Sequence, residues 1–399
     1  MKQIWKLEAV ELLNGLVFFS PVSLLVRTMA GISLSEFFVL QAILSFVILI
    51  FEIPTGALTD KIGYRNSIIL SQVLLFFSRG ILFVSYVTGN FWIFVIEAFI
   101  EGISACFMSG TKNAYLYSNC EESEYASLLA KVTNFGTAGF IISTITYVFL
   151  YNIGGIEALL VATIIACALA IPFTFILAKE EEIQSKEKSI KIRTSDFFKD
   201  RVVVAVVLFT AVLSICGLVI NFFYVDRLIE IGINERWMSL IIIVYSLFQM
   251  LAERILNAVS EKKYNLLMLL CSVAVGGMMT IFALSNAKYL IVAIMVIMPL
   301  FLDIPIYIQD ELINSYIDKH EQQERRATIL SVINMSGNIL EIVFLLASAY
   351  IAGLGISLCY IVTAVLIVIF AVIVFVMLGR KASYDERTNA FAREETDNG

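Results

Sequence analysis

Five ionisable residues interrupt long apolar runs of this 399-residue chain and are its best candidates for chemistry: Arg79, Glu97, Glu101, Asp303 and Glu341. A charged side chain at the centre of a lipid bilayer costs about 2.5–3.5 kcal/mol on insertion scales, so each one needs a partner or water. A carboxylic acid in such a place can bind and release a proton when water reaches it alternately from two sides. These residues therefore predict proton exchange or internal ion pairing.

Glu101 and Asp303 are the preferred proton-exchanging acids, because they lie 202 positions apart at near-equivalent places in the two halves of the chain. An alternative is that Arg79 pairs with Glu97 or Glu101 and only holds its region together. If Arg79 pairs with Glu101, we expect Asp303 to carry the proton.

Two further groups could line a substrate pathway. Asn334, Asn338 and Glu341 recur at helical spacing, so they share one helix face and could line a cavity or bond a neighbouring helix. Asn221 and Phe222 lie in an aromatic stretch that would suit a drug-sized ligand, although ordinary packing also explains them.

Composition excludes most other kinds of site. Apolar residues make up 59% of the chain and charged residues 16%, with a net charge of −6, which is typical of a polytopic membrane protein and not of a nucleic-acid-binding domain. The six cysteines show no paired spacing, and the only histidine, His320, lies in a polar loop. No nucleotide, zinc-protease or nucleophile motif occurs. We therefore expect no enzyme, metal or cofactor.

The apolar runs are long enough to cross a bilayer as helices, for which about 20 residues are needed. Twelve such spans are predicted, at 8–28, 35–58, 67–88, 91–117, 126–151, 156–178, 202–227, 236–259, 265–285, 288–316, 327–351 and 355–378. The predicted fold class is thus an all-α membrane protein. Most of the 28 Lys and Arg residues fall in the loops of one side, so both termini are predicted to be cytoplasmic.

The chain also repeats itself. Glu52, Ala57, Asp60 and Lys61 match Glu253, Ala258, Glu261 and Lys262 at an offset of 201 positions. We expect two six-helix halves, at 1–178 and 201–378, joined by a cytoplasmic linker at 179–200 and followed by a cytoplasmic tail at 379–399. Repeated halves place a binding site near the membrane midplane.

A motif follows the second span: Glu52, Pro54, Gly56, Asp60, Lys61, Gly63 and Arg65. Here Gly56 would permit close helix approach, Gly63 would permit a turn with positive φ, and Asp60 could bind a helix N-terminus. A generic polar hairpin is the alternative. The stretch resembles the loop signature of the major facilitator superfamily, with Tyr64 where a basic residue is usual. This resemblance implies two pseudo-symmetric six-helix bundles and a role of the motif in conformational gating.

Residues 109–117 resemble a bacterial subgroup of drug and tetracycline exporters. Asn113 and Ser118 stand where that subgroup commonly has acidic residues. Ala98 replaces an arginine that proton antiporters carry four residues before Gly102, and residues 136–139 lack the Gly-Pro of exporters.

These patterns predict a monomeric secondary transporter in a bacterial cytoplasmic membrane, which exports a small amphipathic compound such as an antibiotic in exchange for protons. A solute–cation symporter of the same fold is the nearest alternative. A lipid-modifying enzyme and a non-transporting scaffold or sensor are less consistent with the sequence, because neither a nucleophile constellation nor a large soluble domain is found.

Overall fold

The computed structural model describes residues 4–120, 122–178, 201–249, 251–319, 326–353 and 355–397. Within these ranges the chain forms helices, turns and loops and no strand, which confirms the predicted all-α class. The predicted linker at 179–200 lies outside the described residues.

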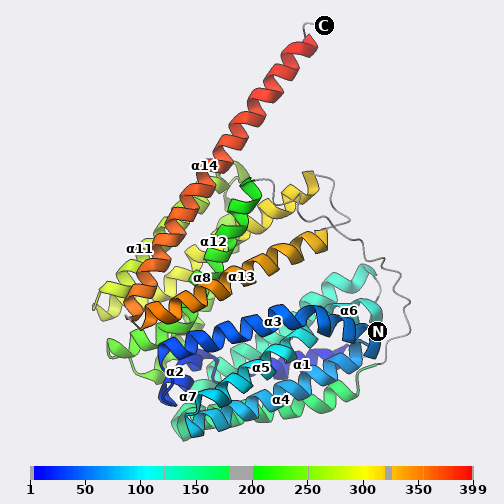
Figure 1. The fold of residues 1–399 in the computed structure, drawn as a ribbon, viewed down its shortest axis with the longest axis vertical. Coiled ribbons are helices and arrows are strands. Elements are labelled where there is room, and N and C mark those ends of the chain that lie inside the picture. Colours follow the sequence, from blue (N-terminus) through cyan, green and yellow to red (C-terminus); the bar gives the residue numbers. More distant parts are fainter. Residues whose placement is uncertain are drawn as a thin grey trace. The chain divides into compact units, whose positions relative to one another are not determined.

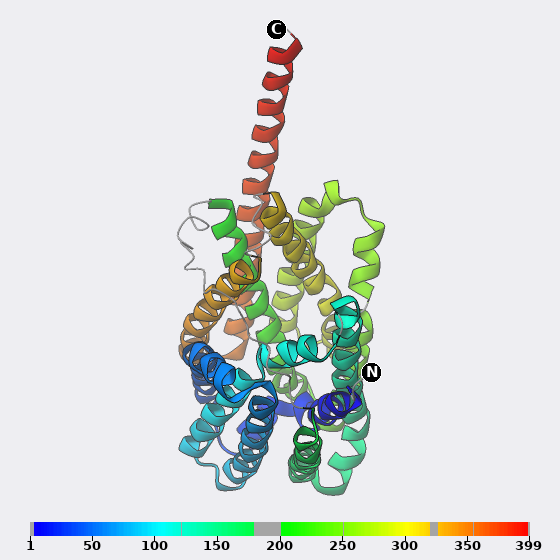
Figure 2. The same cartoon turned by 90° about the vertical axis from the view of Figure 1, so that its right-hand side faces the viewer.

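The helices follow the predicted spans closely (Figure 1). The first part of the chain contains α1 (Trp5–Gly15), η1 (Ser20–Val22), α2 (Ser23–Met29), α3 (Leu34–Ile62), α4 (Tyr64–Thr88), α5 (Phe91–Met108), α6 (Thr111–Asn119) and α7 (Glu122–Phe175). The second part contains α8 (Arg201–Glu230), η3 (Glu235–Trp237), α9 (Met238–Gln249), α10 (Leu251–Ala258), η4 (Glu261–Lys263), α11 (Tyr264–Leu284), α12 (Lys288–Lys319), α13 (Arg326–Ala352) and α14 (Ile356–Asp397). α14 runs through the predicted tail as one helix (Figure 2).

Eleven helical stretches among the described residues are long and apolar enough to cross a membrane. The longest of them lies in α7, which is interrupted at Gly154 and Gly155 by non-helical backbone angles. Gly155 has a φ of 59°, a left-handed conformation that suits glycine. Counting the two parts of α7 separately is consistent with the twelve spans expected.

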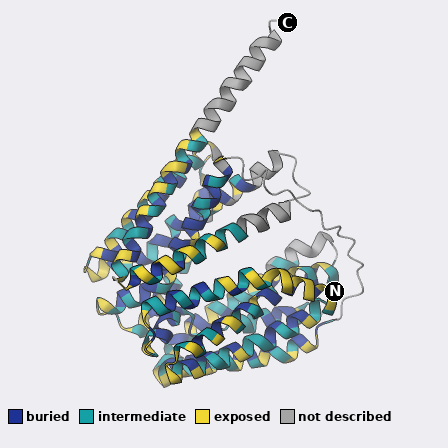
Figure 3. Cartoon of the chain, in the orientation of Figure 1, coloured by how far each residue is buried: buried dark blue, intermediate teal, exposed yellow. Residues whose placement is uncertain are grey.

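The described residues form two compact units. Unit 1 contains α1 to α7 together with residues 225–243 and 342–353, and unit 2 contains the described residues within 201–224, 244–341 and 355–397. Each unit is described by itself below. Exposed positions occur along the helices of both units (Figure 3) and include large apolar side chains such as Ile53, Trp92 and Phe149. Large apolar side chains in such numbers on the surface suit contact with lipid.

Glycines bring two helices of unit 1 into backbone contact. A Cβ atom on Gly15 of α1 would lie 2.2 Å from the Gly136 carbonyl oxygen, and one on Gly139 of α7 would lie 2.1 Å from the Leu12 carbonyl oxygen. Small residues at such positions allow transmembrane helices to approach closely. The glycines at 136 and 139, which replace the Gly-Pro of exporters, therefore serve as a contact surface for α1.

Candidate functional site

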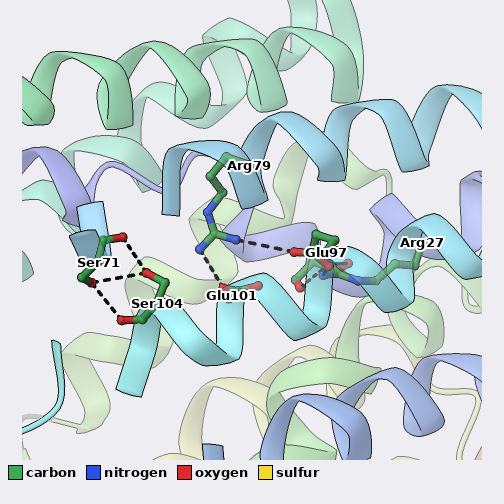
Figure 4. A network of polar contacts seen from close by, with 7 residues as sticks. Arg27, Ser71, Arg79, Glu97, Glu101 and Ser104 are labelled. Atoms are coloured by element: carbon green, nitrogen blue, oxygen red, sulfur yellow. Dashed lines mark hydrogen bonds and ion pairs between the residues drawn. The ribbon is translucent and has the colours of Figure 1, made fainter. Parts of the chain in front are cut away.

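Unit 1 contains a buried ion network of two acids and two bases (Figure 4). Arg79 of α4 lies 2.8 Å from Glu101 and 4.0 Å from Glu97, both on α5. Arg27 of α2 lies 3.6 Å from the second oxygen of Glu97. Arg27 and Glu97 are buried, and the Glu101 side chain is the most accessible of the four, at 24%. The network carries no net charge when all four groups are ionised.

Both arginines have further contacts that hold them in place. Arg27 donates hydrogen bonds to the backbone carbonyl and the hydroxyl of Ser23, at 3.0 and 3.2 Å, and lies over the Phe37 ring. Arg79 lies over the ring of Phe19, with 5.4 Å between its guanidinium carbon and the ring centroid. Cation–π contacts of this kind add to the stability of a cation away from water. The guanidinium groups are thus positioned by α2, α3, α4 and the turn before η1.

This geometry agrees with the alternative interpretation of Arg79 as an ion-pair partner of the α5 acids. Glu101 is a direct partner of Arg79, so its negative charge is compensated inside the protein. By the criterion stated above, the expectation for the proton carrier moves from Glu101 to Asp303.

Arg27 is the member of the network that the sequence reasoning missed, because it lies at the very end of the first predicted span, 8–28. The sequence did contain an indication of a second buried base. Arg79 balances only one of Glu97 and Glu101, so a second buried base is needed on a neighbouring helix, and Arg27 lies in the last turn of α2.

Neutral polar contacts continue from the network along α4. The Ser71 hydroxyl donates to the Ser104 carbonyl at 2.8 Å, and the Ser104 hydroxyl donates to the Ser71 carbonyl at 2.9 Å (Figure 4). Gln72 and Asn14 exchange hydrogen bonds at 2.8 and 3.0 Å, and Gln72 also donates to the Cys167 carbonyl. These bonds tie α4 to α5, α1 and α7.

Unit 2 holds a buried acid in a different setting. Asp303 of α12 is 8% exposed and lies within hydrogen-bonding reach of Gln249 on α9. Tyr245, one turn earlier on α9, interacts with Asp303 and with Asn221 of α8. Within the part of the chain that the structure describes, no lysine or arginine forms an ion pair with Asp303. Among the described residues, the partners identified for this acid are thus dipolar groups and not cations.

The remaining predicted pathway residues of unit 2 belong to α8 and α13. Phe222 is half-buried on α8, and Asn338 and Glu341 are half-buried on α13. A largely apolar cavity of about 290 Å³ between α8 and α13 is lined by Val207 and Ser336 among others. The side chain of Asn334 lies outside the described residues.

The predicted gating motif lies mostly on helix and not in a loop. α3 continues to Ile62, and Gly63 alone forms the turn into α4, with the predicted positive φ of 88°. Glu52 accepts a hydrogen bond from Ser109 at 3.2 Å. Asp60 and Lys61 are exposed, as is Pro54. A Cβ atom added to Gly56 would meet no atom within 4 Å among the described residues, so the close helix approach expected there stays a prediction.

Arg65, the last motif residue, has a structural role. It donates a hydrogen bond to the Phe175 carbonyl at the C-terminal end of α7. Lys6 donates to the next carbonyl, that of Ile176, at 2.6 Å, and the Tyr115 hydroxyl donates to the Ala178 carbonyl at 3.2 Å. The last carbonyls of a helix lack partners within it and carry partial negative charge, so two cations and a hydroxyl stabilise this end.

No group of three or more His, Cys, Asp or Glu side chains that could hold a metal ion occurs among the described residues.

The comparisons with known proteins agree on the fold. A variant of the nucleoside transporter NupG has a TM-score of 0.72 at 13% identity, with 94% of this chain and 98% of that chain covered. A D-xylose-proton symporter has a TM-score of 0.70 at 14% identity, with 93% and 97% covered. The comparison with curated proteins gives no match.

At these identities the solved structures show the fold alone. The sequence itself matches the Major Facilitator Superfamily over residues 9–340, which include the charged network, the motif after the second span and Asp303. Members of this superfamily are transporters and not enzymes. The chain therefore belongs to the major facilitator superfamily.

Proposed function

We propose that the chain is a proton-coupled secondary transporter of a small molecule, with Asp303 as the proton-binding residue. One observation carries the proposal: Asp303 is a buried acid without a cationic partner among the described residues, whereas Glu97 and Glu101 have two arginines. We further propose that the protein acts as a monomer in a bacterial cytoplasmic membrane with both termini in the cytoplasm.

A proton is the simplest charge that can neutralise Asp303. Its neighbours Gln249 and Tyr245 can hydrogen-bond either the carboxylate or the carboxylic acid, so protonation requires no rearrangement of a salt bridge. Glu101 would first have to break its 2.8 Å contact with Arg79. The surroundings of Asp303 therefore suit a group that gains and loses a proton in each transport cycle better than those of Glu101 do.

Two observations favour opposite directions of transport. The similarity of residues 109–117 to drug exporters favours proton-driven export of a small amphipathic compound. The glycines at 136 and 139 in place of Gly-Pro, together with the fold similarity to a D-xylose-proton symporter, favour uptake. Symport is therefore the second candidate.

Proton binding can be measured without a known substrate. Infrared difference spectra of the purified protein between low and high pH should contain a carboxylic-acid band that Asp303→Asn removes and Glu101→Gln retains. Glu311→Gln is the matched control, because Glu311 is an exposed acid on the same helix. A band that persists in Asp303→Asn and vanishes in Glu101→Gln would overturn the assignment.

Transport is tested by whole-cell accumulation of labelled uridine, D-xylose and tetracycline, with and without a protonophore. For any compound that is moved, Asp303→Asn should abolish transport driven by a pH gradient and preserve downhill exchange. The direction is decided by whether protons move with or against the labelled compound in proteoliposomes. Full proton-driven transport by Asp303→Asn would refute the proposal.

We propose in addition that Asp60 stabilises one conformer in the transport cycle. Its exposed place near the end of α3 leaves the carboxylate accessible to a helix N-terminus. Asp60→Asn should then slow flux while ligand binding and folding stay near wild type. An equal loss of binding and flux would place Asp60 in the substrate site or in the fold instead.

A further inference from the structure

A cavity of about 600 Å³ opens in unit 1 where span four is broken between α5 and α6. The break consists of Ser109 and Gly110, and Gly110 has a φ of 69°. Residues of α5, of α6 and of the first part of α7 line the cavity, among them Met108, Ser109, Lys112, Asn113, Leu129 and Thr133. The volume falls within the range of about 300–1,000 Å³ that small-molecule sites occupy.

The lining combines an apolar wall with polar groups. Met108 and Leu129 supply apolar surface, whereas Ser109, Asn113 and Thr133 are exposed and carry hydroxyl or amide groups. Polar groups that faced hydrocarbon would be left without partners, so this combination suits a wet cavity that receives a compound with one polar end. Helices that are broken within a transporter commonly border such sites.

Among the described residues of the lining, Lys112 is the only ionised group. Its ammonium lies 3.1 Å from Glu11 of α1, and the two side chains are 24% and 14% exposed. Asn113, beside it, is neutral where the similar exporters commonly carry an acid. The first N–H groups of α6 add partial positive charge on the same side, because Gly110 offers no side-chain cap. The described lining thus offers a cation and N–H donors to a ligand, whereas the carboxylates of Glu11 and Glu52 compete for Lys112 and Ser109.

We propose that this cavity binds an amphipathic anion, a compound with a carboxylate, sulfonate or phosphate group and an apolar body. The anionic group would pair with Lys112 in competition with Glu11, accept a hydrogen bond from Asn113, and compete with Glu52 for the Ser109 hydroxyl. The apolar body would pack on Met108 and Leu129. The cavity shares no residue with Asp303 or with its neighbours Gln249, Tyr245 and Asn221. The anion-site proposal is therefore independent of the proton-binding proposal.

Because the ligand and Glu11 compete for Lys112, replacing Lys112 and replacing Glu11 should change the affinity for an anion in opposite directions. Replacing Lys112 by glutamine should weaken binding of an anion about tenfold or more, since a charge-assisted hydrogen bond is lost. Replacing Glu11 by glutamine should strengthen binding, by up to about fivefold for an accessible pair, because the internal competitor is gone. A cationic ligand would give both effects with the reverse sign.

Three photoreactive probes of one shape can read out this preference. These are para-benzoylbenzoate, the cation para-benzoylbenzyl-trimethylammonium and the neutral para-benzoylbenzyl alcohol. The full-length protein is labelled in phosphatidylcholine vesicles, and the attachment site is mapped by mass spectrometry. We expect the carboxylate to label Met108 with the highest affinity of the three.

Lys131 provides a matched control. It also pairs with an α1 acid, Glu8, at 2.9 Å, but it is absent from the cavity lining. Lys131→Gln should leave labelling unchanged. Because Lys112→Gln leaves Glu11 unpaired and could harm folding, the double variant Glu11→Gln, Lys112→Gln is measured beside it, and it should also lose the preference for the anion.

A second set of vesicles that contain phosphatidylglycerol identifies the source of the anion. Loss of Met108 labelling there would indicate a lipid phosphate as the natural occupant, and unchanged labelling would indicate a soluble compound. Both outcomes support an anion site. Equal labelling by all three probes, or full carboxylate labelling of Lys112→Gln, would overturn the proposal.

Discussion

Replacing Arg79 by methionine should destabilise unit 1 strongly, because it leaves two acids with one base. Methionine has a similar length and can fill the space of the side chain stem. Glu97 would keep Arg27 at 3.6 Å, whereas Glu101 would lose its hydrogen-bonded partner. The network would then carry an uncompensated negative charge.

The contact distances set the size of the effect. At an effective dielectric constant of about 20, contacts of 2.8 and 4.0 Å correspond to about 6 and about 4 kcal/mol of Coulomb attraction. Much of this offsets the cost of taking the charges out of water, so removing one partner of a buried pair costs about 3–5 kcal/mol. That is a large share of a typical unfolding free energy of about 5–15 kcal/mol.

The assay is reversible unfolding in mixed micelles by titration with sodium dodecyl sulfate, followed by near-ultraviolet circular dichroism. The double variant Arg79→Met, Glu101→Gln restores charge balance and should regain most of the lost free energy. Arg236→Met, at an exposed arginine, is the control and should change the free energy by less than about 0.5 kcal/mol. A loss below about 1 kcal/mol for Arg79→Met, or a double variant no more stable than Arg79→Met, would refute the reasoning.

Three further predictions concern packing, capping and topology. Gly15→Ala should lower the free energy of unfolding by about 1–3 kcal/mol, because its Cβ would meet a backbone oxygen at 2.2 Å. Gly56→Ala has open space around its Cβ and should not destabilise the protein, so equal effects of the two variants in the same unfolding titration would contradict the contact at Gly15. Arg65→Met should cost about 1.5–3 kcal/mol through the lost bond to the end of α7, and unchanged stability would contradict that role. In a cysteine-free background, a cysteine at Asn90 should react with an impermeant thiol reagent added outside and one at Ser189 should not, and the reverse pattern would invert the orientation.

The sequence was sufficient for the helices, because each apolar run is long and bounded by a clear signal. Ser33 and Glu36 form a reciprocal cap at the start of α3, and Gly63 ends that helix with the positive φ expected of it. Such signals are local. They are readable from spacing alone.

The partners within the charged network were less predictable, because they depend on how α2, α4 and α5 pack. Composition indicated that buried charges need partners but not which ones, and Arg27 was not among the candidates. The cavity beside Lys112 was also missed, since it results from a two-residue break that shortens span four at its end. Contacts between segments far apart in the chain have no periodic signal.

The turn at Gly154 and Gly155 has a consequence for biogenesis. It joins two apolar segments of α7 with almost no polar chain between them, so no hydrophilic loop has to be translocated across the bilayer. The two segments can leave the insertion machinery together as a helical hairpin, whose contacts are local in sequence and therefore form quickly.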